Sequence, residues 1–289
     1  MVVEAPADLD LVAYRDPFIR RDGDTWRMFV GAAGRDGAAM ALSYTSDDLD
    51  TWTYDGVALQ RPSTERHPVW MGALWECPQV FDLDEQAVML SSVWDADVLH
   101  YAGYALGSFT SGRFDAREWG RLTWGDSLYA PSLFTDAQGR QAVTFWLRGV
   151  EGDGWAGAHS VPYRVGIRRG RLVAYPHPDV AQHRTELRAD GAVAGLAADI
   201  EWDGGEGFLT ISSGATVLIS FARADDNIVA TTESSRTTFP VDGSLRIIVD
   251  GPIVEASSDA GVYAAAVRPG GADLQVRATT GGLRVHGLA

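Results

Sequence analysis

Short apolar runs, each bounded by polar residues, recur along the whole chain. The runs are rich in β-branched and aromatic residues, and Gly, Asp or Pro stands between them, which is the pattern of strands joined by tight turns. No stretch keeps a helical period of apolar positions beyond about ten residues. The chain is therefore predicted to be all-β. The clearest expected strands are residues 25–32, 86–93, 141–149, 208–213, 216–223, 245–251 and 261–268.

An approximate repeat organises the first part of the chain. Three segments share one plan, in which a proline precedes an apolar segment, an Asp/Gly turn and a strand. They are "RDPFIRRDGDTWRMFVGA" (15–32), "ECPQVFDLDEQAVMLSSV" (76–93) and "YAPSLFTDAQGRQAVTFWL" (129–147), and their prolines, Pro17, Pro78 and Pro131, lie 61 and 53 residues apart. A period of about 40–60 residues with several strands per unit indicates a β-propeller, in which each repeat is one blade.

The residues before these prolines are the candidates for chemistry. Because the first strand of each blade lines the propeller channel, Asp16 and Glu76 are expected to meet at its mouth. Two carboxyl groups at one site suit glycoside hydrolysis, in which one protonates the leaving oxygen and the other attacks or stabilises the cationic sugar. The ordinary alternative for each acid is a turn or cap at a strand end. Tryptophans that could pack on sugar faces, or simply fill the core, are Trp75, Trp94, Trp124 and Trp146.

Composition narrows the classes of partner. The chain has 289 residues, 39 acidic against 24 basic, and a net charge of −15, so a nucleic-acid partner is not expected. All basic residues are arginine, which excludes Schiff-base lysines and the lysine-dependent phosphate loop. The single cysteine, Cys77, cannot form an internal disulfide and is expected to be a packed small residue. No apolar run approaches the ~20 residues of a membrane span, so no membrane partner is expected.

Two motifs carry a resemblance to a known family. "AYRDPF", followed by "WRMFVGA" and "ALSYTSDDLDTWTYDG", resembles the middle motif of glycoside hydrolase family 32, and "ALWECPQVFDLD" resembles its acid/base motif. That family contains invertases, levanases, inulinases and fructosyltransferases. The similarity continues through "GSFTSGRFDAREWGRLTWGDSLYAPSLFTDAQGRQAVTFWLRG" and "SVPYRVGIRRGRLVAYPHPDV". It ends in "LRIIVDGPIVEASSDAG", which resembles a strand pair of the family's C-terminal β-sandwich.

The resemblance implies roles for individual residues. Glu76 would be the general acid/base, and Asp16 would stabilise the oxocarbenium-like transition state by bonding to fructose hydroxyls. Arg15 would be a charged donor beside Asp16, able to hold Glu76 or a substrate hydroxyl. Further sugar contacts are expected from Trp75, Trp94, Asp126 and Tyr129. No cofactor and no metal are expected, and the substrate class implied is sucrose or a fructan, cleaved or transferred with retention.

One departure from the family is plain. The family's nucleophile is an aspartate in an Asn-Asp-Pro-type motif of the first blade, far upstream of the middle motif. This chain reaches its middle motif at residue 15, contains no Asn-Asp-Pro, and has Asn227 as its only asparagine. It is therefore expected to hold blades three to five and the sandwich, without blades one and two. Asp8 and Asp10 lie in a segment that resembles the family's own lead-in to the middle motif and are poor substitutes.

Several interpretations stay open. The chain could be an inactive C-terminal piece of a family 32 enzyme, completed by an N-terminal segment, or a short protein that assembles with copies of itself. Exposed blade edges favour association. It could also be a non-catalytic carbohydrate-binding or assembly protein. A rival interpretation is an inverting five-bladed glycosidase that acts on arabinose- or xylose-containing substrates, with Asp16 as the general base near the N-terminus. The "WECP" motif and the C-terminal sandwich argue against it.

The sequence thus predicts an all-β chain with a partial five-bladed β-propeller and a C-terminal β-sandwich. The expected division is propeller blades in residues 1–160, a linker in 161–185 and the sandwich in 186–289. The first ten residues do not resemble a secretory leader, which favours a cytoplasmic over a secreted location without deciding it. The choice of fructoside, and that between hydrolysis and transfer, are open.

Overall fold

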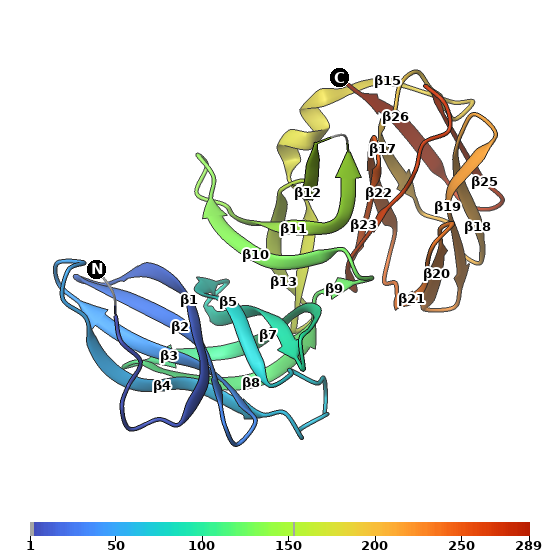
Figure 1. The fold of residues 1–289 in the computed structure, drawn as a ribbon. Coiled ribbons are helices and arrows are strands. Elements are labelled where there is room, and N and C mark those ends of the chain that lie inside the picture. Colours follow the sequence, from blue (N-terminus) through green and yellow to red (C-terminus); the bar gives the residue numbers. More distant parts are fainter. Residues whose placement is uncertain (1–2, 153) are drawn as a thin grey trace. The chain divides into compact units, whose positions relative to one another are not determined.

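The computed structural model describes residues 3–152 and 154–289 (Figure 1). The predicted all-β class is confirmed. Five of the seven expected stretches lie within a strand, and the other two, 245–251 and 261–268, run one and two residues past the ends of β22 (Leu245–Asp250) and β24 (Gly261–Ala266). The one helix among the described residues is the 3-10 helix η1 (Pro178–His183). Two compact units can be separated, and each is described by itself. The first comprises Met1–Arg121, Tyr129–Leu133 and Gly166–Leu172, and the second Leu122–Leu128, Phe134–Val165 and Val173–Ala289.

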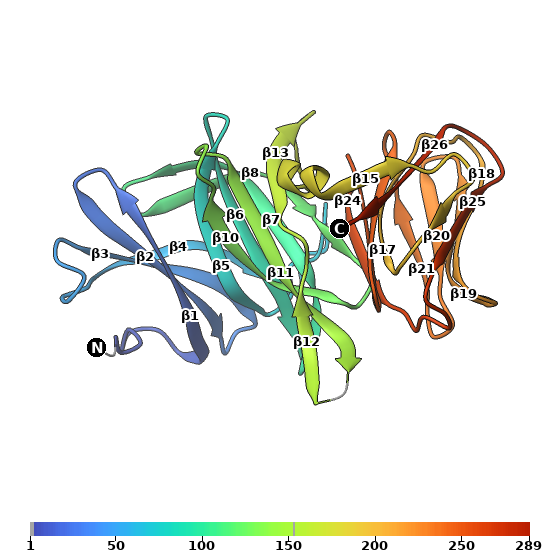
Figure 2. The same ribbon diagram turned by 90° about the horizontal axis from the view of Figure 1, so that it is seen from above.

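The first unit contains two four-stranded antiparallel sheets, each a meander in which consecutive strands are neighbours. The strands of the first sheet are β1 (Leu11–Asp22), β2 (Thr25–Gly34), β3 (Ala38–Ser46) and β4 (Thr53–Pro62). Those of the second, which can be followed in Figure 2, are β5 (Leu74–Leu83), β6 (Gln86–Asp95), β7 (Val98–Thr110) and β8 (Arg113–Arg121). Four consecutive strands per repeat are the architecture of propeller blades.

Side-chain alternation explains why the middle strands of these blades are apolar at most positions. In β2, Met28 and Val30 point into a cluster with residues of the N-terminal segment, β1 and β4, whereas Phe29 between them points into a second cluster. That second cluster contains Trp75 and Val80 of β5, so it joins the two blades. A strand buried on both faces needs apolar residues at every position rather than at every second one.

A third meander runs in the order β10-β11-β13-β14, with β12 paired to β11. Its strands are β10 (Leu128–Thr135), β11 (Gln141–Gly152), β12 (Trp155–His159), β13 (Tyr163–Arg168) and β14 (Arg171–Pro176). Residues 161–185, expected from the sequence to be a linker, hold β13, β14 and η1. The prolines of the repeat lie in the first strands of the three meanders, β1, β5 and β10.

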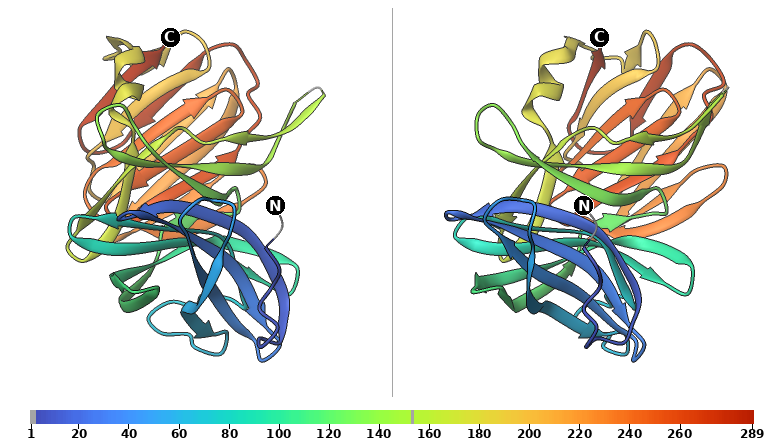
Figure 3. Two further views of the ribbon diagram at one scale, coloured as in Figure 1. Left: turned by 90° about the vertical axis from the view of Figure 1, so that its left-hand side faces the viewer. Right: turned by 60° about the vertical axis from the view of Figure 1, so that its left-hand side comes forward.

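The C-terminal part of the second unit is a β-sandwich whose strands can be followed in both views of Figure 3. One sheet has the order β15-β26-β17-β22-β23-β24-β9, from β15 (Arg184–Leu187), β26 (Leu283–Leu288), β17 (Ala197–Trp202), β22 (Leu245–Asp250), β23 (Ile253–Ser258), β24 (Gly261–Ala266) and β9 (Thr123–Trp124). The other has the order β16-β25-β18-β19-β20-β21, from β16 (Ala192–Val193), β25 (Leu274–Ala278), β18 (Gly207–Ser213), β19 (Thr216–Ala224), β20 (Asn227–Thr231) and β21 (Arg236–Pro240).

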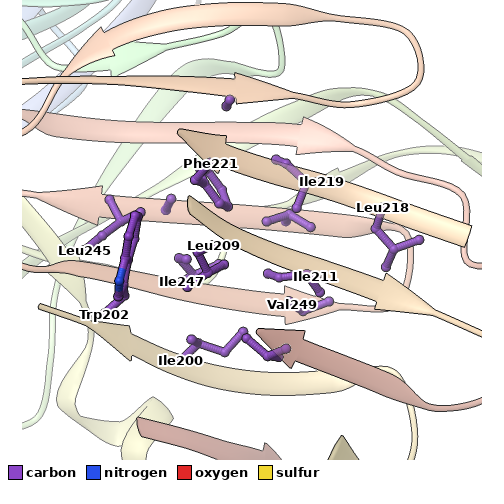
Figure 4. Close-up of a cluster of buried hydrophobic side chains, with 14 of the residues drawn as sticks. Ile200, Trp202, Leu209, Ile211, Leu218, Ile219, Phe221, Leu245, Ile247 and Val249 are labelled. Carbon is purple, nitrogen blue, oxygen red and sulfur yellow. The ribbon is translucent and has the colours of Figure 1, made fainter. Parts of the chain in front are cut away.

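One hydrophobic core fills the space between the two sandwich sheets (Figure 4). Trp202 and Ile247 of the seven-stranded sheet face Leu209 and Phe221 of the six-stranded sheet, and all four are fully buried. Each such side chain contributes roughly 1.5–3 kcal/mol by leaving water. The predicted combination of propeller blades and a C-terminal sandwich is therefore confirmed.

Candidate active site

A backbone residue with positive φ recurs within the first strand of each of the three meanders. Asp16, Cys77 and Ala130, each directly before the repeat proline, have φ values of 60°, 49° and 47°. Residues other than glycine rarely adopt positive φ, and a following proline restricts them further. In β1 and β5 the pairing register with the next strand shifts at this point, between Arg15 and Phe18 and between Glu76 and Gln79. β1 and β5 thus each contain a β-bulge at the residue before the proline, a feature that re-aims side chains at functional sites.

The first bulge directs the Asp16 carboxylate at the second bulge. Asp16 Oδ2 accepts the backbone N–H of Cys77 at 3.1 Å, and the Cys77 thiol lies 3.7 Å from the same oxygen. Burial, with the nearby charges of Asp16 and Glu76, raises the pKa of Cys77 to about 12. The thiol therefore stays neutral, as expected for a packed cysteine, and Asp16 is fixed beside the residue that follows Glu76.

Glu76 is held at both carboxylate oxygens. Arg15 Nη1 donates to Oε1 at 3.0 Å, and the Tyr129 hydroxyl donates to Oε2 at 2.7 Å. Ser91 on β6 donates to the Glu76 backbone carbonyl at 2.9 Å. The Glu76 side chain keeps 12% of its surface exposed, so it is oriented but open to solvent. These contacts place Arg15, Asp16, Glu76 and Tyr129 in one constellation within the first unit.

The positive-φ residue of β10, Ala130, is secured in the same way as Cys77. Ser92 Oγ on β6 accepts the backbone N–H of Ala130 at 2.9 Å, and Gln79 Oε1 on β5 accepts that of Leu133 at 3.0 Å. The N–H of each pre-proline residue in β5 and β10 is therefore bonded to a side-chain oxygen from the preceding blade. An unpaired buried N–H would cost about 1–3 kcal/mol, so these bonds set the register of one blade on the next.

Close backbone approach supports the same constellation. Gly31 on β2 pairs with Arg15 on β1, and a Cβ at Gly31 would lie 2.1 Å from the Trp75 carbonyl oxygen. Only glycine allows the first blade to lie this near to the strand that carries Glu76. The spacing of the two carboxylate-bearing strands therefore depends on a residue that has no side chain.

The remaining expected sugar contacts lie elsewhere. Trp75 is fully buried, and its Nε1 donates to the Met71 carbonyl, so its ring belongs to the core and not to an open surface. Trp94 is partly exposed at the end of β6, opposite Leu74. Asp126 is an exposed residue of the second unit and lines a cavity of about 400 Å³ there together with Arg148 and Tyr263.

Sequence reasoning missed two serines that support the constellation. Ser91 and Ser92 stand next to each other in an apolar strand, and both are completely buried. A pair of hydroxyls inside "AVMLSSV" was the available signal, because buried hydroxyls need partners. Within residues 3–152 and 154–289, no group of His, Cys, Asp and Glu could hold a metal ion, and no helix is long and apolar enough to cross a membrane.

Comparisons with curated proteins identify relatives. Sucrose-6-phosphate hydrolase of Escherichia coli is 28% identical over 181 residues, which cover 57% of this chain and 37% of that protein. The sucrose-6-phosphate hydrolase of Vibrio alginolyticus is 29% identical over 192 residues, which cover 60% of this chain and 38% of that protein. The chain thus spans less than half the length of these relatives.

Solved structures share the fold along nearly the whole chain. The GH32 β-fructofuranosidase BmSUC1 of Bombyx mori has a TM-score of 0.83 at 19% identity, covering 98% of this chain and 67% of that one. The sucrose-6-phosphate hydrolase of Lactobacillus gasseri has a TM-score of 0.76 at 18% identity, covering 96% of this chain and 66% of that one. The family model of the glycosyl hydrolases family 32 N-terminal domain matches residues 1–176. Since that match covers more than half of the chain and agrees with the motifs, the protein belongs to glycoside hydrolase family 32.

Proposed function

We propose that the chain carries the acid/base part of a β-fructofuranosidase site, for retaining hydrolysis or transfer of fructosyl units from sucrose or fructans. The observation that carries this proposal is the Asp16–Glu76 constellation. The Asp16 carboxylate accepts the backbone N–H of Cys77, the residue after Glu76, and Arg15, the residue before Asp16, donates to the Glu76 carboxylate. Family membership supports the reaction class. The chain covers only part of its relatives, so their activity is proposed for it.

Each member of the constellation has a role in this proposal. Glu76, open to solvent and oriented by Arg15 and Tyr129, protonates the glycosidic oxygen and then takes a proton from water or an acceptor hydroxyl. Asp16 bonds to fructose hydroxyls and stabilises the cationic sugar in the transition state. Arg15, with 48% of its side chain exposed, can still offer N–H groups to a substrate.

The substrate class rests on the relatives. The curated relatives are named sucrose-6-phosphate hydrolases, and a variant of the Bombyx mori enzyme has been solved in complex with sucrose, with a TM-score of 0.82 to this chain. These names support a sucrose-type fructoside as ligand, with levan or inulin as longer alternatives. Both kinds of substrate present a terminal fructosyl group, so the proposal covers either.

A second candidate is a carbohydrate-binding or assembly protein. The observation in its favour is that no Asn-Asp-Pro occurs among the 289 residues, so no residue here matches the family's nucleophile motif. Without that aspartate, no covalent fructosyl intermediate forms at the usual position. Asp16 and Glu76 could still bind a fructoside, at millimolar affinity at best, because few contacts would offset the lost freedom of the ligand.

Association of the chain with a further blade would make the enzyme and the binding protein compatible as candidate functions. Ile19 on β1 and Val80 on β5 occupy the same position of the repeat, two residues after the proline, yet Ile19 is 44% exposed and Val80 only 2%. β5 is covered by a neighbouring blade, and we propose that β1 also receives one, from a complementing N-terminal segment or from another copy. We also propose the division of the chain into blades in residues 1–160 and a sandwich in residues 186–289.

Two measurements on one sample test the proposal. Light scattering gives the mass, and a fructose-release assay with sucrose, sucrose-6-phosphate, levan and inulin gives the activity. The chain alone is expected to release no fructose by the family's route, and an assembly or a complemented form is expected to release it. Vigorous release by a monomer would reject the complementation and reveal a nucleophile within these 289 residues. Absence of release from every complemented form would favour the binding protein.

A further inference from the structure

Two adjoining cavities of the second unit take no part in the site described above. The larger, of about 560 Å³, is lined by residues of β11, the start of β19, the end of β24 and the loop before β21. The smaller, of about 400 Å³, is lined by residues of β11, β24 and the segment after β9. Gly149, Ser234 and Ala266 line both cavities, which together are called the second-unit groove below. Each volume lies in the range of small-ligand sites, about 300–1,000 Å³.

Hydroxyl groups and charges of both signs line the groove. The hydroxyl-bearing residues are Ser127, Thr216, Thr232, Ser234, Ser235 and Thr237. The charged residues are three acids, Asp126, Glu151 and Glu233, and two arginines, Arg148 and Arg268. The carboxylates disfavour an anionic ligand and the guanidinium groups disfavour a cationic one. Because acceptors and donors are both present, the lining suits a neutral ligand that carries many hydroxyl groups.

A buried hydroxyl group in the groove lacks a partner. Tyr263 lines the smaller cavity and is 1% exposed, and its hydroxyl has no hydrogen-bond partner among the residues that the structure describes. Burial raises the pKa of Tyr263 to about 12, while the nearby Ser235 lowers it and the charge of Asp126 raises it further. Ser235 and Asp126 both line the groove, so the hydroxyl lies beside two groove residues. Buried polar groups are rarely left unpaired, and the unpaired hydroxyl therefore indicates a ligand.

The walls of the groove are ordered by their own hydrogen bonds. Thr232 Oγ1 accepts the backbone N–H groups of Ser234 and Ser235 at 3.3 Å and 3.0 Å. The backbone N–H of Arg148 on β11 donates to the Ser127 carbonyl at 2.9 Å, which ties the segment after β9 to the hairpin strand. A ligand therefore meets walls that are already in place, and little free energy is spent on ordering them.

An exposed tryptophan lies beside the groove. Trp155 is on β12, which forms a hairpin with β11 (Figure 2), and it pairs with Gly152, a residue that lines the larger cavity. Its ring covers Gly152, because a Cβ at Gly152 would lie 2.3 Å from Trp155 Nε1. Trp155 is nevertheless 48% exposed, so part of its ring remains open to a ligand. A large exposed aromatic ring next to a polar groove offers both an apolar face and hydrogen-bonding groups.

We propose that the second-unit groove binds a neutral oligosaccharide. Each sugar hydroxyl both donates and accepts, so it can pair with the carboxylates, the guanidinium groups and the Tyr263 hydroxyl of the lining. The Trp155 ring provides an apolar surface for the C–H face of a sugar ring. Two adjoining cavities hold more than one sugar unit, which favours a chain over a monosaccharide. This inference goes beyond the proposed function, because it uses no residue of the Asp16–Glu76 constellation and requires no bond to be broken.

The test measures binding of nystose and maltotetraose, two neutral tetrasaccharides, to the protein by calorimetry. We expect at least one of them to bind, Trp155→Ala to weaken that binding about fivefold, and Tyr263→Phe to weaken it about threefold. The matched control is Phe208→Ala, since Phe208 is an aromatic residue of the same unit, is 57% exposed and lines neither cavity. That variant should bind as the unaltered chain does.

The outcomes separate this inference from the proposed function. Absence of binding by both tetrasaccharides, or equal losses in Trp155→Ala and Phe208→Ala, would overturn the inference even if the protein releases fructose. A loss in Glu76→Gln without one in Trp155→Ala would place the ligand at the Asp16–Glu76 constellation and would also overturn it. Tetragalacturonate, an acidic tetrasaccharide, should bind at least about tenfold more weakly, and equal affinity would overturn the neutral class. Losses confined to Trp155→Ala and Tyr263→Phe would support the inference even if no fructose is released.

Discussion

Two glutamates in different units accept a tyrosine hydroxyl at the same distance, yet their surroundings differ. Tyr129 donates to Glu76 at 2.7 Å in the first unit, and Tyr163 donates to Glu255 at 2.7 Å in the second. Glu76 also pairs with Arg15 and remains partly exposed. Glu255 is 3% exposed, receives the Val161 N–H at 2.9 Å, and has no ion pair within the described ranges.

The comparison shows that a tyrosine hydrogen bond does not by itself set the pKa of a glutamate. Burial raises the pKa of Glu255 to about 7, although its two hydrogen bonds act in the opposite direction. Desolvation therefore outweighs two good donors when no cation is present. A carboxyl group in that state ties β23 to the segment before β13, whereas one with a cation and a solvent path can exchange protons with a ligand. The same residue pair is thus structural in one unit and, in our proposal, part of the acid/base site in the other.

The largest expected effect separates the two glutamates by activity. In any preparation that releases fructose, Glu76→Gln should lower turnover about 10²–10⁴-fold while the fold is retained, because proton transfer is lost without a change of volume. Glu255→Gln is the matched control and should leave turnover within about twofold when assayed at a temperature where it stays folded. Fructose release and circular dichroism measure the two properties. Near-normal turnover in Glu76→Gln would remove the acid/base assignment.

Glu76 could be predicted from the sequence and Glu255 could not. Glu76 stands at a fixed position before a proline that recurs in each blade, so the repeat itself marks Glu76 and, one blade later, Tyr129. Glu255 stands alone in the apolar run "IVEASS", and its partners Val161 and Tyr163 lie far upstream in the sequence. The apolar pattern of one segment indicates which face of a strand is buried. It does not indicate which distant residue donates a hydrogen bond to a side chain on that strand.

The same limit applies to the fold. The β-branched and aromatic runs sufficed to predict the all-β class and the clearest strands, whereas the sandwich was implied by the family resemblance. Strand β9, only Thr123–Trp124, joins the seven-stranded sheet by pairing in parallel with Val262 and Tyr263 of β24. Two residues carry no periodicity, so no local pattern could have placed them there. The positive φ values at Asp16 and Cys77 could not be predicted from the sequence either. A following proline favours an extended conformation, so the local sequence points away from positive φ.

The next effect in size concerns the stability of the second unit. Glu255→Ala should lower the free energy of unfolding by about 2–4 kcal/mol, because it leaves the Tyr163 hydroxyl and the Val161 N–H buried without an acceptor. Chemical denaturation measures this value. Glu233→Ala, at an exposed position of the same unit, is the control and should change it by less than about 0.5 kcal/mol. Equal losses in both variants would show that Glu255 is not the tie described here.

The pH dependence of stability should also report Glu255. Its pKa in the folded protein, about 7, lies above the ordinary value of 4.5, so the folded state holds the proton more tightly than the unfolded state. The resulting stabilisation is complete below about pH 4.5 and is lost as the pH rises through about 7. Denaturation at several pH values between about 5 and 8 should therefore give a decline in the unaltered chain that Glu255→Gln does not have. Parallel curves for the two proteins would contradict the raised pKa.

The smallest expected effect compares the two tyrosines directly. Tyr163→Phe leaves Glu255 Oε2 in a fully buried position without its donor, which should cost about 1.5–3 kcal/mol of unfolding free energy. Tyr129→Phe removes an equally short bond, but Glu76 is partly exposed and keeps Arg15, so water can replace the hydroxyl and the cost should stay below about 1 kcal/mol. Chemical denaturation of both variants measures the difference. Both substitutions keep the aromatic ring and remove only the hydroxyl, so changes in packing do not enter the comparison. If Tyr129→Phe costs as much as Tyr163→Phe, solvent does not reach Glu76, and the property that suits this glutamate to proton transfer would be absent.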